Sequence, residues 1–378
     1  MSGFGWHPAA RLIAPGGAWS AQPPGAGGLI APEPPAAALM AAMGSAGFRI
    51  GGAGPLTAGP GQFETLSGGT LAAPRAIRRS FASWRASFAV NARLFGIGPG
   101  ARVASLGGLN HSLALYAMIE ALSLGAEAHL LAGLRPDRQR HWLADHGVTH
   151  LYATPAQLRL LLASPGPDLP ALRLALIGGA RLDAPLRAAL AASSGAEARE
   201  FYGTSEASFI ALSDADTPEG AAGRPYPGVE IRCPAGRVQV RSALLAEGVA
   251  DAAGWCDTGE TGRLQAGVLW IDGRADRAFR VAETWVQPER LEDFLLACPG
   301  IRQAAVMAVA DTARGLVPVA LVEGQGDGAA ILRQMRGAFG SLAAPRALHW
   351  LPDWPLLPSG KTDLRALARW LEGVGCAR

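Results

Sequence analysis

The sequence predicts an α/β protein, with a large N-terminal α/β domain of mixed sheets and a small α+β domain at the C-terminus. Between residues 100 and 205, short apolar runs alternate with helical stretches, which is typical of a sheet with largely parallel strands. After Gly223 the runs become short strands with glycine-bearing turns, and after Asp276 a second compact unit follows. The length of 378 residues also exceeds that of an ordinary single core.

The elements are expected at definite places along the chain. Residues 1–60 form a lead segment rich in Gly, Pro and Ala, for which we expect loops, one short helix at 35–46 and little sheet. The N-terminal domain is predicted over 61–273 and the C-terminal domain over 277–378. Strands are expected at 102–106, 126–131, 149–153, 174–177, 198–202, 229–232, 237–241, 262–265, 268–271, 303–309, 317–322 and 347–351. Helices are expected at 80–94, 112–124, 137–146, 155–163, 288–297, 329–340 and 364–371.

Composition and charge exclude several classes of protein. The formal net charge is only +3, and the denser arginine groups at 75–85 and 135–140 are expected to be solvated helix faces, so we expect no nucleic-acid partner. The apolar segment 113–134 is interrupted by charged residues and no signal peptide is evident, so no membrane span is expected. The four cysteines form no metal or disulfide pattern and are expected to be buried thiols. These features predict a cytoplasmic protein.

One lysine stands out against an arginine-rich background. Lysine and arginine together number 34, and Lys361 is the only lysine, in the loop predicted before the last helix. An ammonium is a compact point charge that can enter a closed site, whereas a guanidinium is a planar fork that needs more room. Lys361 is therefore a candidate catalytic residue, with chance survival of one lysine as the alternative.

Two further candidate sites combine glycine with hydroxyl or polar residues. The turn at 67–75 lets backbone N–H groups converge on phosphate oxygens, although a glycine-rich turn alone is more often only a turn. The segments 178–180 and 202–206 lie at the ends of predicted strands. Ligands of parallel α/β sheets bind beyond the carboxyl ends of strands, so we expect the functional site there.

Six segments occur in one order along the chain: 67–75, 202–206, 223–229, 257–262, 273–276 and 358–361. In this order they resemble the phosphate loop, the Tyr-Gly-Thr-Ser-Glu motif, the glycine-proline segment, the ribose motif, the hinge and the catalytic-lysine motif of the adenylate-forming superfamily. That family contains acyl- and aryl-CoA synthetases, the adenylation domains of peptide synthetases, and luciferases. The resemblance covers roughly residues 60–370.

The resemblance implies a two-step reaction. A carboxylate attacks the α-phosphate of Mg·ATP to give an acyl-adenylate and pyrophosphate, and a thiol then takes the acyl group. The first step joins two anions, so the site must neutralise charge and hold the attack in line. The resemblance further implies a mobile C-terminal lid that carries Lys361 and turns about Asp276 between the half-reactions.

The resemblance also implies roles for individual residues. Lys361 would bridge the carboxylate and the α-phosphate, Thr204 would bind the α-phosphate, and Glu206 would hold Mg²⁺. His111 and Phe209 would line the acyl pocket. The implied nucleotide-binding residues are Ser67, Gly68, Gly69, Thr70, Gly178, Gly179, Ala180, Tyr202, which would stack on adenine, Gly203, Asp257, which would accept the ribose hydroxyls, and Arg274, which would contact ribose or phosphate.

Purely structural explanations stay open for several of these residues. The run from Thr204 to Glu206 resembles an N-terminal helix-capping segment. Asp257-Thr258-Gly259 can form an Asx-turn without any ligand. His111 lies at a predicted helix entry, where it can simply make local hydrogen bonds.

The sequence departs from the family pattern at three places. In the phosphate loop, Leu71, Ala72 and Arg75 replace a hydroxyl residue, a glycine and a lysine, which weakens the expected grip on pyrophosphate. About 65 residues precede this loop, so the N-terminal subdomain of larger relatives is expected to be missing or abbreviated, as in short acyl- or aryl-CoA ligases. After the hinge, Glu283 aligns with a glycine beside the pantetheine tunnel of CoA-using relatives and would narrow that tunnel.

We therefore expect an ATP- and Mg²⁺-dependent acyl- or aryl-CoA ligase that acts on a small-molecule carboxylic acid. One alternative is transfer to the phosphopantetheine of an acyl carrier protein, favoured if Glu283 blocks CoA. Another is a non-catalytic nucleotide-binding homologue that acts as an assembly partner, motivated by the altered phosphate loop. The apolar residues Phe209, Ile210 and Leu212 favour a fatty or aryl acid over an amino acid.

Overall fold

The computed structural model describes residues 3–20, 27–67, 75–312, 315–357 and 362–375. Within this part of the chain the largest sheet has nine strands in the order β13-β12-β11-β10-β9-β7-β8-β1-β2. From β11 to β1 the neighbours pair in parallel, and β2, β12 and β13 add antiparallel edges. The strands are β1 (Arg11–Ala14), β2 (Gly17–Trp19), β7 (Arg102–Ser105), β8 (Glu127–Leu130), β9 (His150–Ala153), β10 (Leu174–Gly178), β11 (Glu197–Thr204), β12 (Ser208–Leu212) and β13 (Arg224–Pro225).

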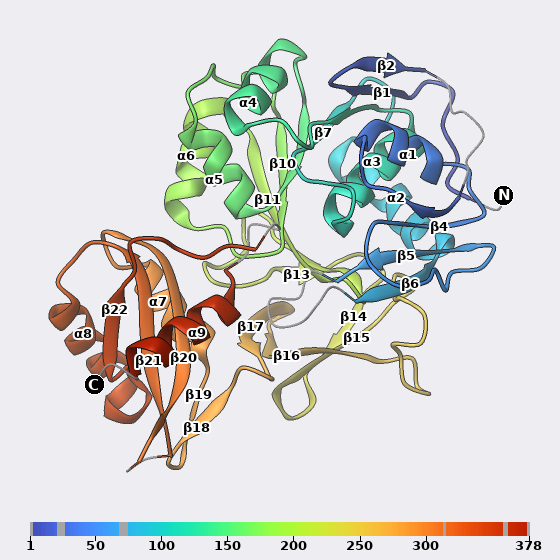
Figure 1. The fold of residues 1–378 in the computed structure, drawn as a ribbon. Helices are drawn as coiled ribbons and strands as arrows, with labels where there is room; N and C mark the ends of the chain where they lie inside the picture. The colour runs from blue at the N-terminus through green and yellow to red at the C-terminus, as the bar shows by residue number, and fades with distance from the viewer. Residues whose placement is uncertain (1–2, 21–26, 68–74, 313–314, 358–361, 376–378) are drawn as a thin grey trace.

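Helices cover both faces of this sheet (Figure 1), with α1 to α3 on one side and α4 to α6 on the other. Local signals set their ends: Ser80 accepts a hydrogen bond from the N–H of Ser83 at the start of α2, and Gly96 ends that helix in the left-handed region. The predicted α/β class with mixed sheets is therefore confirmed. The helices are α1 (Pro35–Ala42), α2 (Phe81–Phe95), α3 (Ser112–Leu124), α4 (Pro136–Asp145), α5 (Pro155–Ala163) and α6 (Ala184–Ser194).

Two four-stranded sheets accompany the large one in the described chain. The first contains β3 (Gly28–Ile30), β4 (Gly47–Ile50), β5 (Gln62–Leu66) and β6 (Ala76–Ser80). The second is an antiparallel sheet of β14 (Glu230–Arg232), β15 (Arg237–Arg241), β16 (Cys256–Gln265) and β17 (Val268–Arg274). Both lie on the same side of the large sheet, below it in the view of Figure 1.

The expectation of little sheet before residue 60 is wrong, because β1 to β4 all lie there. Each has only three or four residues, too short to stand out from a Gly/Pro-rich background. They persist because they join larger sheets: β1 pairs with β8, and β4 pairs with β5. Phe4 secures the start of the segment, since its buried ring packs edge-on against Phe63 and Phe81 at centroid distances of 5.2 and 4.7 Å.

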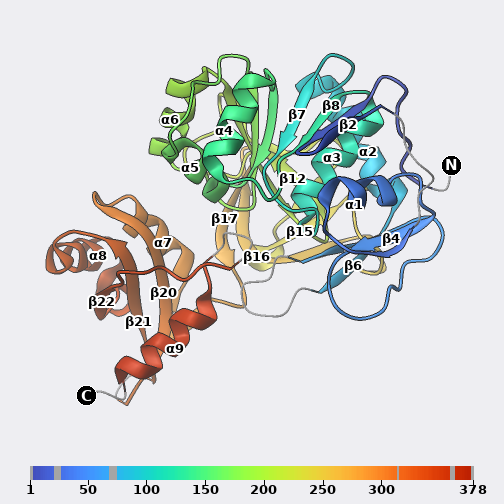
Figure 2. The same ribbon diagram turned by 45° about the horizontal axis from the view of Figure 1, so that its top comes forward.

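The C-terminal unit is a separate layered structure, seen apart from the large sheet in Figure 2. A hairpin, β18 (Phe279–Val281) and β19 (Thr284–Val286), precedes a sheet of β20 (Ile301–Asp311), β21 (Gly315–Gly324) and β22 (Ala347–Trp350). Its helices are α7 (Pro288–Leu296), α8 (Gly328–Ala343) and α9 (Leu364–Gly375). β17 continues to Arg274, so the predicted division at 273–277 falls where this strand ends.

Two other expectations concern membranes and cysteines. Among the described residues, no helix is both long and apolar enough to cross a lipid bilayer. Cys233, Cys256 and Cys298 are free thiols, but only Cys256 is buried, so the expected burial holds for one of these three. Cys376 lies outside the described residues.

A buried acid joins the helix layer to the sheet. Glu120 on α3 is fully buried and accepts hydrogen bonds from Asn91 (2.8 Å), Tyr116 (2.8 Å) and Tyr152 (2.5 Å). These partners come from α2, α3 and β9, so one carboxyl group links three elements. Burial raises the pKa of Glu120 to about 7, against the hydrogen bonds that lower it, because no basic side chain contributes to its shift.

Stability should therefore depend on pH through Glu120. Its pKa is higher in the folded state than in the unfolded chain, so the folded state holds the proton more tightly between pH 4.5 and 7. Relative to Glu120→Gln, the wild type should lose about 3 kcal/mol of unfolding free energy as pH rises through this window, and no more above it. Urea unfolding at pH 5, 6 and 8 measures this difference.

The exposed Glu283→Gln variant is the matched control for this series. A difference between wild type and Glu120→Gln that stays constant with pH would contradict the raised pKa.

Candidate active site at the carboxyl ends of β10 and β11

The carboxyl ends of β10 and β11 meet with no room for a side chain between them. Gly178 pairs with Phe201, and a Cβ atom on Gly178 would lie 2.2 Å from the Phe201 ring. Gly179 follows with a φ of +90°, which favours glycine. The structure thus brings together the two strand ends, 178–180 and 202–206, that the sequence indicates as a site.

Residues 205–207 form a turn between β11 and β12 and do not begin a helix. The hydroxyl of Thr204 accepts a hydrogen bond from the N–H of Ala207 at 3.1 Å, which closes this turn, so the alternative of a helix-capping segment is wrong. A Cβ on Gly203 would lie 2.1 Å from the carbonyl oxygen of Ser208. Glycine at 203 therefore lets the chain reverse tightly and present Thr204 and Glu206 at the strand end.

The ends of the predicted phosphate loop lie beside this turn. Ser67 and Arg75 are paired, since the N–H of Ser67 donates to the Arg75 carbonyl (2.8 Å) and the N–H of Arg75 donates to the Ser67 hydroxyl (2.9 Å). The Arg75 guanidinium also forms an ion pair with Glu206 at 2.7 Å. Gly68, Gly69 and Thr70 lie outside the described residues, as does Lys361.

Tyr202 connects the strand ends to the antiparallel sheet. Its hydroxyl donates to the carboxylate of Glu260 on β16. Burial and this carboxylate raise the pKa of Tyr202 well above its usual value, so the phenol stays protonated. Glu260 was not predicted from the sequence; its position within the 257–262 motif was the available signal.

The predicted ribose residues are held by other side chains of the same sheet. Asp257 accepts hydrogen bonds from Arg237 (2.9 and 3.2 Å) and from the N–H of Gly259 (2.8 Å). The last contact is the Asx-turn considered as the structural alternative. The carboxylate is 39% exposed, so its remaining hydrogen-bonding capacity faces solvent.

The predicted hinge contains a bidentate ion pair. Arg274 donates to both carboxylate oxygens of Asp276, at 2.8 and 2.7 Å, and these bonds hold the pKa of Asp276 below its usual value. Beyond them, Arg277 pairs with Glu289 and Glu292 on α7. The segment after β17 is thus fixed to the C-terminal unit.

An ion pair joins the loop after β10 to α7. The guanidinium of Arg181 lies 2.7 Å from the carboxylate of Asp293 and also donates to the carbonyl of Gly220 at 3.1 Å. Burial raises the pKa of Asp293, and the arginine opposes that shift. A cavity of about 530 Å³ between the two units is lined by these groups.

The two predicted acyl-pocket residues differ in their surroundings. His111 immediately precedes α3 and is half-buried. Phe209 is 3% exposed and stacks on Tyr226 at a centroid distance of 4.9 Å, with Tyr116 edge-on at 5.2 Å. Phe209 therefore belongs to the aromatic core beneath the strand ends.

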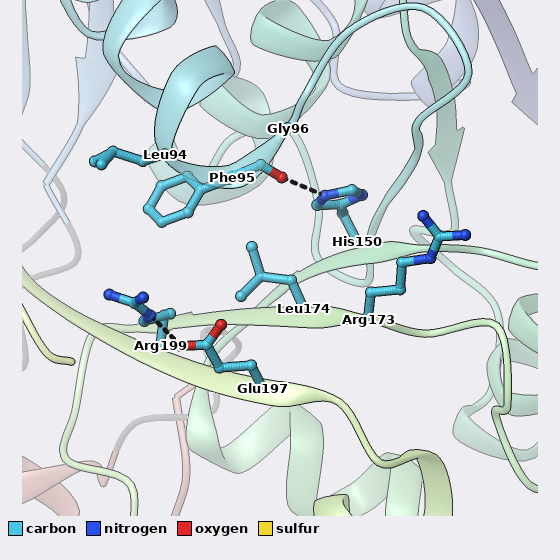
Figure 3. A pocket seen from close by; sticks show the side chains of 8 residues that line it. All are labelled: Leu94, Phe95, Gly96, His150, Arg173, Leu174, Glu197 and Arg199. Carbon is cyan, nitrogen blue, oxygen red and sulfur yellow. Dashed lines mark hydrogen bonds and ion pairs between the residues drawn. The ribbon is translucent and has the colours of Figure 1, made fainter. Parts of the chain in front are cut away.

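A second cavity, of about 250 Å³, lies at the amino ends of the central strands of the large sheet, opposite the carboxyl ends that form the candidate site. Figure 3 shows His150, Leu174 and Glu197 there, at the starts of β9, β10 and β11. His150 bonds to the Phe95 carbonyl at 2.7 Å, and burial lowers its pKa. This cavity is remote from Gly178 and Thr204, which end their strands.

Glu206 is the residue that the sequence indicates for Mg²⁺, and in the structure its carboxylate is 28% exposed and pairs with Arg75. Mg²⁺ prefers oxygen ligands and is usually held by one or two carboxylates together with substrate phosphates and water. Among the described residues no group of three His, Cys, Asp or Glu side chains could hold a metal ion by itself. One partly exposed carboxylate beside a predicted phosphate site suits an ion that arrives with the nucleotide.

Comparisons with known proteins identify the family and the fold of the chain. A family profile described as AMP-binding enzyme matches residues 65–235, and a second, described as AMP-binding enzyme C-terminal domain, matches residues 290–361. The uncharacterised acyl-CoA ligase YhfT of Bacillus subtilis is 28% identical over 81% of this chain and 68% of its own length. The 2-succinylbenzoate-CoA ligase of Salmonella typhimurium is 33% identical over 60% of this chain, which spans about half of that relative (51%).

Solved structures resemble the chain over most of its length. The amide bond synthetase McbA from Marinactinospora thermotolerans has a TM-score of 0.73 and 26% identity, covering 85% of this chain and 72% of McbA. The o-succinylbenzoate-CoA synthetase MenE of Bacillus subtilis, solved with ATP and magnesium, has a TM-score of 0.72 and 21% identity, covering 81% of this chain and 69% of MenE, and shares the fold.

The glycine at 178 provides a test of the strand-end geometry. Gly178→Ala should lower the unfolding free energy by about 1–3 kcal/mol, because the methyl group must displace the Phe201 ring. Gly337→Ala on α8 is the control: its Cβ meets nothing within 4 Å, so it should be neutral or stabilise by up to about 1 kcal/mol. Urea unfolding compares the two, and equal effects would show that the β10–β11 contact tolerates a side chain.

Proposed function

Because the chain belongs to the AMP-binding enzyme family, we propose that it activates a carboxylic acid with ATP and transfers the acyl group to the thiol of CoA. In the first step a carboxylate oxygen bonds to the α-phosphorus while the bond to pyrophosphate breaks. In the second the thiol sulfur bonds to the acyl carbon, AMP leaves, and the thiol proton is released. The names of the relatives, acyl-CoA ligase and 2-succinylbenzoate-CoA ligase, support this reaction.

One observation carries the proposal: Thr204, Glu206 and the ends of the phosphate loop lie together at the strand ends where Gly178 and Tyr202 also lie. Here Thr204 donates to the α-phosphate and Glu206 binds Mg²⁺, which neutralises the phosphates when bound. Arg75 is 72% exposed in its pair with Glu206, which is itself 28% exposed, so opening the pair costs on the order of 1 kcal/mol. Arg75 is then free to turn towards the phosphates.

The remaining predicted roles follow the same arrangement. Tyr202 packs against adenine, with its ring held by the bond to Glu260. Asp257 and Arg274 contact the ribose from β16 and β17, and Asp276 is the hinge about which the C-terminal lid turns. Gly179, Ala180 and Gly203 provide backbone close to the nucleotide. Lys361 supplies the point charge between the carboxylate and the α-phosphate.

The acid is proposed to be apolar and compact. His111 and Phe209 border the acyl pocket, and Phe209 is backed by Tyr226, Tyr116 and Phe201 at 4.7–5.2 Å. Because these rings fill the space behind Phe209, the proposed acyl pocket suits an aryl or short acyl group better than a long chain. Benzoate, indoleacetate, octanoate and palmitate form a suitable first panel.

A second acceptor is favoured by Glu283. This residue lies between β18 and β19, with its side chain 95% exposed and paired with Arg280. When the β18–β19 hairpin turns towards the site for the second step, the Glu283 carboxylate narrows the tunnel through which the thiol of CoA would reach the acyl group. The carrier-protein phosphopantetheine is therefore the alternative acceptor.

The reaction is tested by ATP–pyrophosphate exchange with this acid panel. Exchange should require both Mg²⁺ and one of the acids. Lys361→Ala should lower the exchange rate about 100-fold, and Lys361→Arg should not restore it, because a planar fork does not replace a point charge. Transfer from a chemically prepared acyl-adenylate should fall much less.

Two outcomes would contradict these roles. Equal losses in the two half-reactions would count against Lys361 as an adenylation residue. ATP binding without pyrophosphate exchange for any acid would favour the non-catalytic nucleotide-binding homologue. The control variant is Arg369→Ala at an exposed position of α9, which shows whether the loss of a positive charge in this region lowers exchange by itself.

Glu283 predicts the choice of acceptor. Glu283→Gly should raise kcat/KM for CoA several-fold and leave pyrophosphate exchange unchanged, because the side chain acts only in the second step. Glu283→Gln, which keeps the bulk and removes the charge, separates the two effects. An unchanged response to CoA in both variants would show that Glu283 lies outside the acceptor path.

A further inference from the structure

A buried arginine lies directly beneath the turn that carries Thr204 and Glu206. Arg79 is on β6, opposite Phe63 of β5, and is only 1% exposed. The arginines of 75–85 were expected on solvated helix faces, and this is wrong for Arg78 and Arg79, which lie on strand β6, and Arg79 is also buried. Burying a guanidinium is costly unless its hydrogen bonds and charge are compensated.

The Arg79 side chain is bonded to two backbone carbonyls. Nη1 donates to the carbonyl of Leu244 at 2.7 Å, and Nη2 donates to the carbonyl of Ser205 at 2.5 Å. Ser205 stands between Thr204 and Glu206. One guanidinium therefore fixes the turn between β11 and β12 against β6, the strand that follows the predicted phosphate loop.

The loop around Leu244 strengthens this junction. The N–H of Ala246 donates to the Glu206 carbonyl at 2.7 Å, and the N–H of Glu247 donates to the Arg78 carbonyl at 2.9 Å. The Glu247 carboxylate also accepts from Arg78 at 2.9 Å and from Gln62 at 2.7 Å. The turn, the loop and β6 are thus bonded to one another pairwise, with Arg79 between them.

The charge of Arg79 is not neutralised by a direct ion pair within the described chain. Burial lowers its pKa to about 10, so it remains a cation at neutral pH, and the Glu206 carboxylate favours the charged form from a distance. Glu206 itself is paired with Arg75. Arg49 differs in this respect: it is also 1% exposed, but it pairs directly with Glu64 at 2.7 Å.

We propose that Arg79 is a positioning residue of the ATP site, which holds the Ser205 carbonyl so that Thr204 and Glu206 face the phosphates and which places an uncompensated positive charge behind them. The inference rests on the proposed function of this turn. Anionic phosphates would balance the buried charge, so Arg79 should favour ATP over adenosine, which carries no phosphate.

Calorimetric titration of the full chain with Mg·ATP and with adenosine tests this role. Arg79→Met keeps the length of the side chain but removes the charge and both hydrogen bonds. It should weaken Mg·ATP binding at least about tenfold and leave adenosine binding nearly unchanged. Arg79→Lys keeps the charge and one donor, so it should recover part of the ATP affinity and part of the pyrophosphate exchange.

Arg49→Met is the matched control, because it removes an equally buried arginine from strand β4 of the same sheet. It should lower thermal stability without changing the ratio of ATP to adenosine affinity. If Arg79→Met does not fold, the Arg79→Gln variant decides, because it keeps a hydrogen-bond donor but removes the charge: a ratio of ATP to adenosine affinity equal to that of the wild type overturns the proposal. An Arg79→Met variant that loses both ligands equally, or keeps ATP binding within about twofold, also overturns it.

The test is separable from that of the proposed function. A wild-type protein that binds Mg·ATP but exchanges pyrophosphate with no acid refutes the proposed ligase activity, while the affinity ratio still decides the role of Arg79. Failure of the wild type to bind Mg·ATP would overturn both.

Discussion

The close approach of β10 and β11 at their carboxyl ends is the constraint on which the candidate site depends. Because Gly178 leaves space for the Phe201 ring, the two parallel strands end side by side. The bulge at Tyr202 and the tight reversal at Gly203 then direct the 205–207 turn towards β6. Tyr202 on β11 donates a hydrogen bond to Glu260 on β16, so the antiparallel sheet of β14 to β17 is also joined to these strand ends.

Two kinds of arginine surround this turn, and their burial separates their roles. Arg75 is 72% exposed, so its ion pair with Glu206 is weak and can exchange for a metal ion or a phosphate at little cost. Arg79 is buried and bonded to main-chain carbonyls, so it cannot exchange partners without disrupting the turn. The site thus combines one exposed and one buried cation.

The proposed acyl pocket depends on a different set of groups. Phe209 and Tyr226 stack beneath the strand ends, and Tyr226 donates to Asn91, which in turn donates to the buried Glu120. With its pKa raised to about 7, this carboxyl group is neutral below neutral pH, and hydrogen bonds from Asn91, Tyr116 and Tyr152 hold the helix layer to it. This hydrogen-bond network holds Tyr226 in place against the Phe209 ring.

Many elements were predictable because their signals are local. Helices 112–124 and 155–163 match α3 and α5, and alternation predicted the parallel strands to within a few residues. The strands of the lead segment were missed because three or four residues carry no periodicity of their own. Arg79 was missed because an arginine in a run of charged residues is usually solvated, and only its neighbours in space reveal its burial.

The sequence by itself determined the α/β class, the order of the motifs and the residue types available for phosphate, metal and ribose contacts, since these depend on spacing along one chain. Only the tertiary structure decided that Arg75 pairs with Glu206, that Tyr202 meets Glu260, and that Arg79 holds the turn between Thr204 and Glu206. Each of these contacts joins residues 58 to 131 positions apart. Such pairings are set by how the sheets pack together, and no local pattern encodes them.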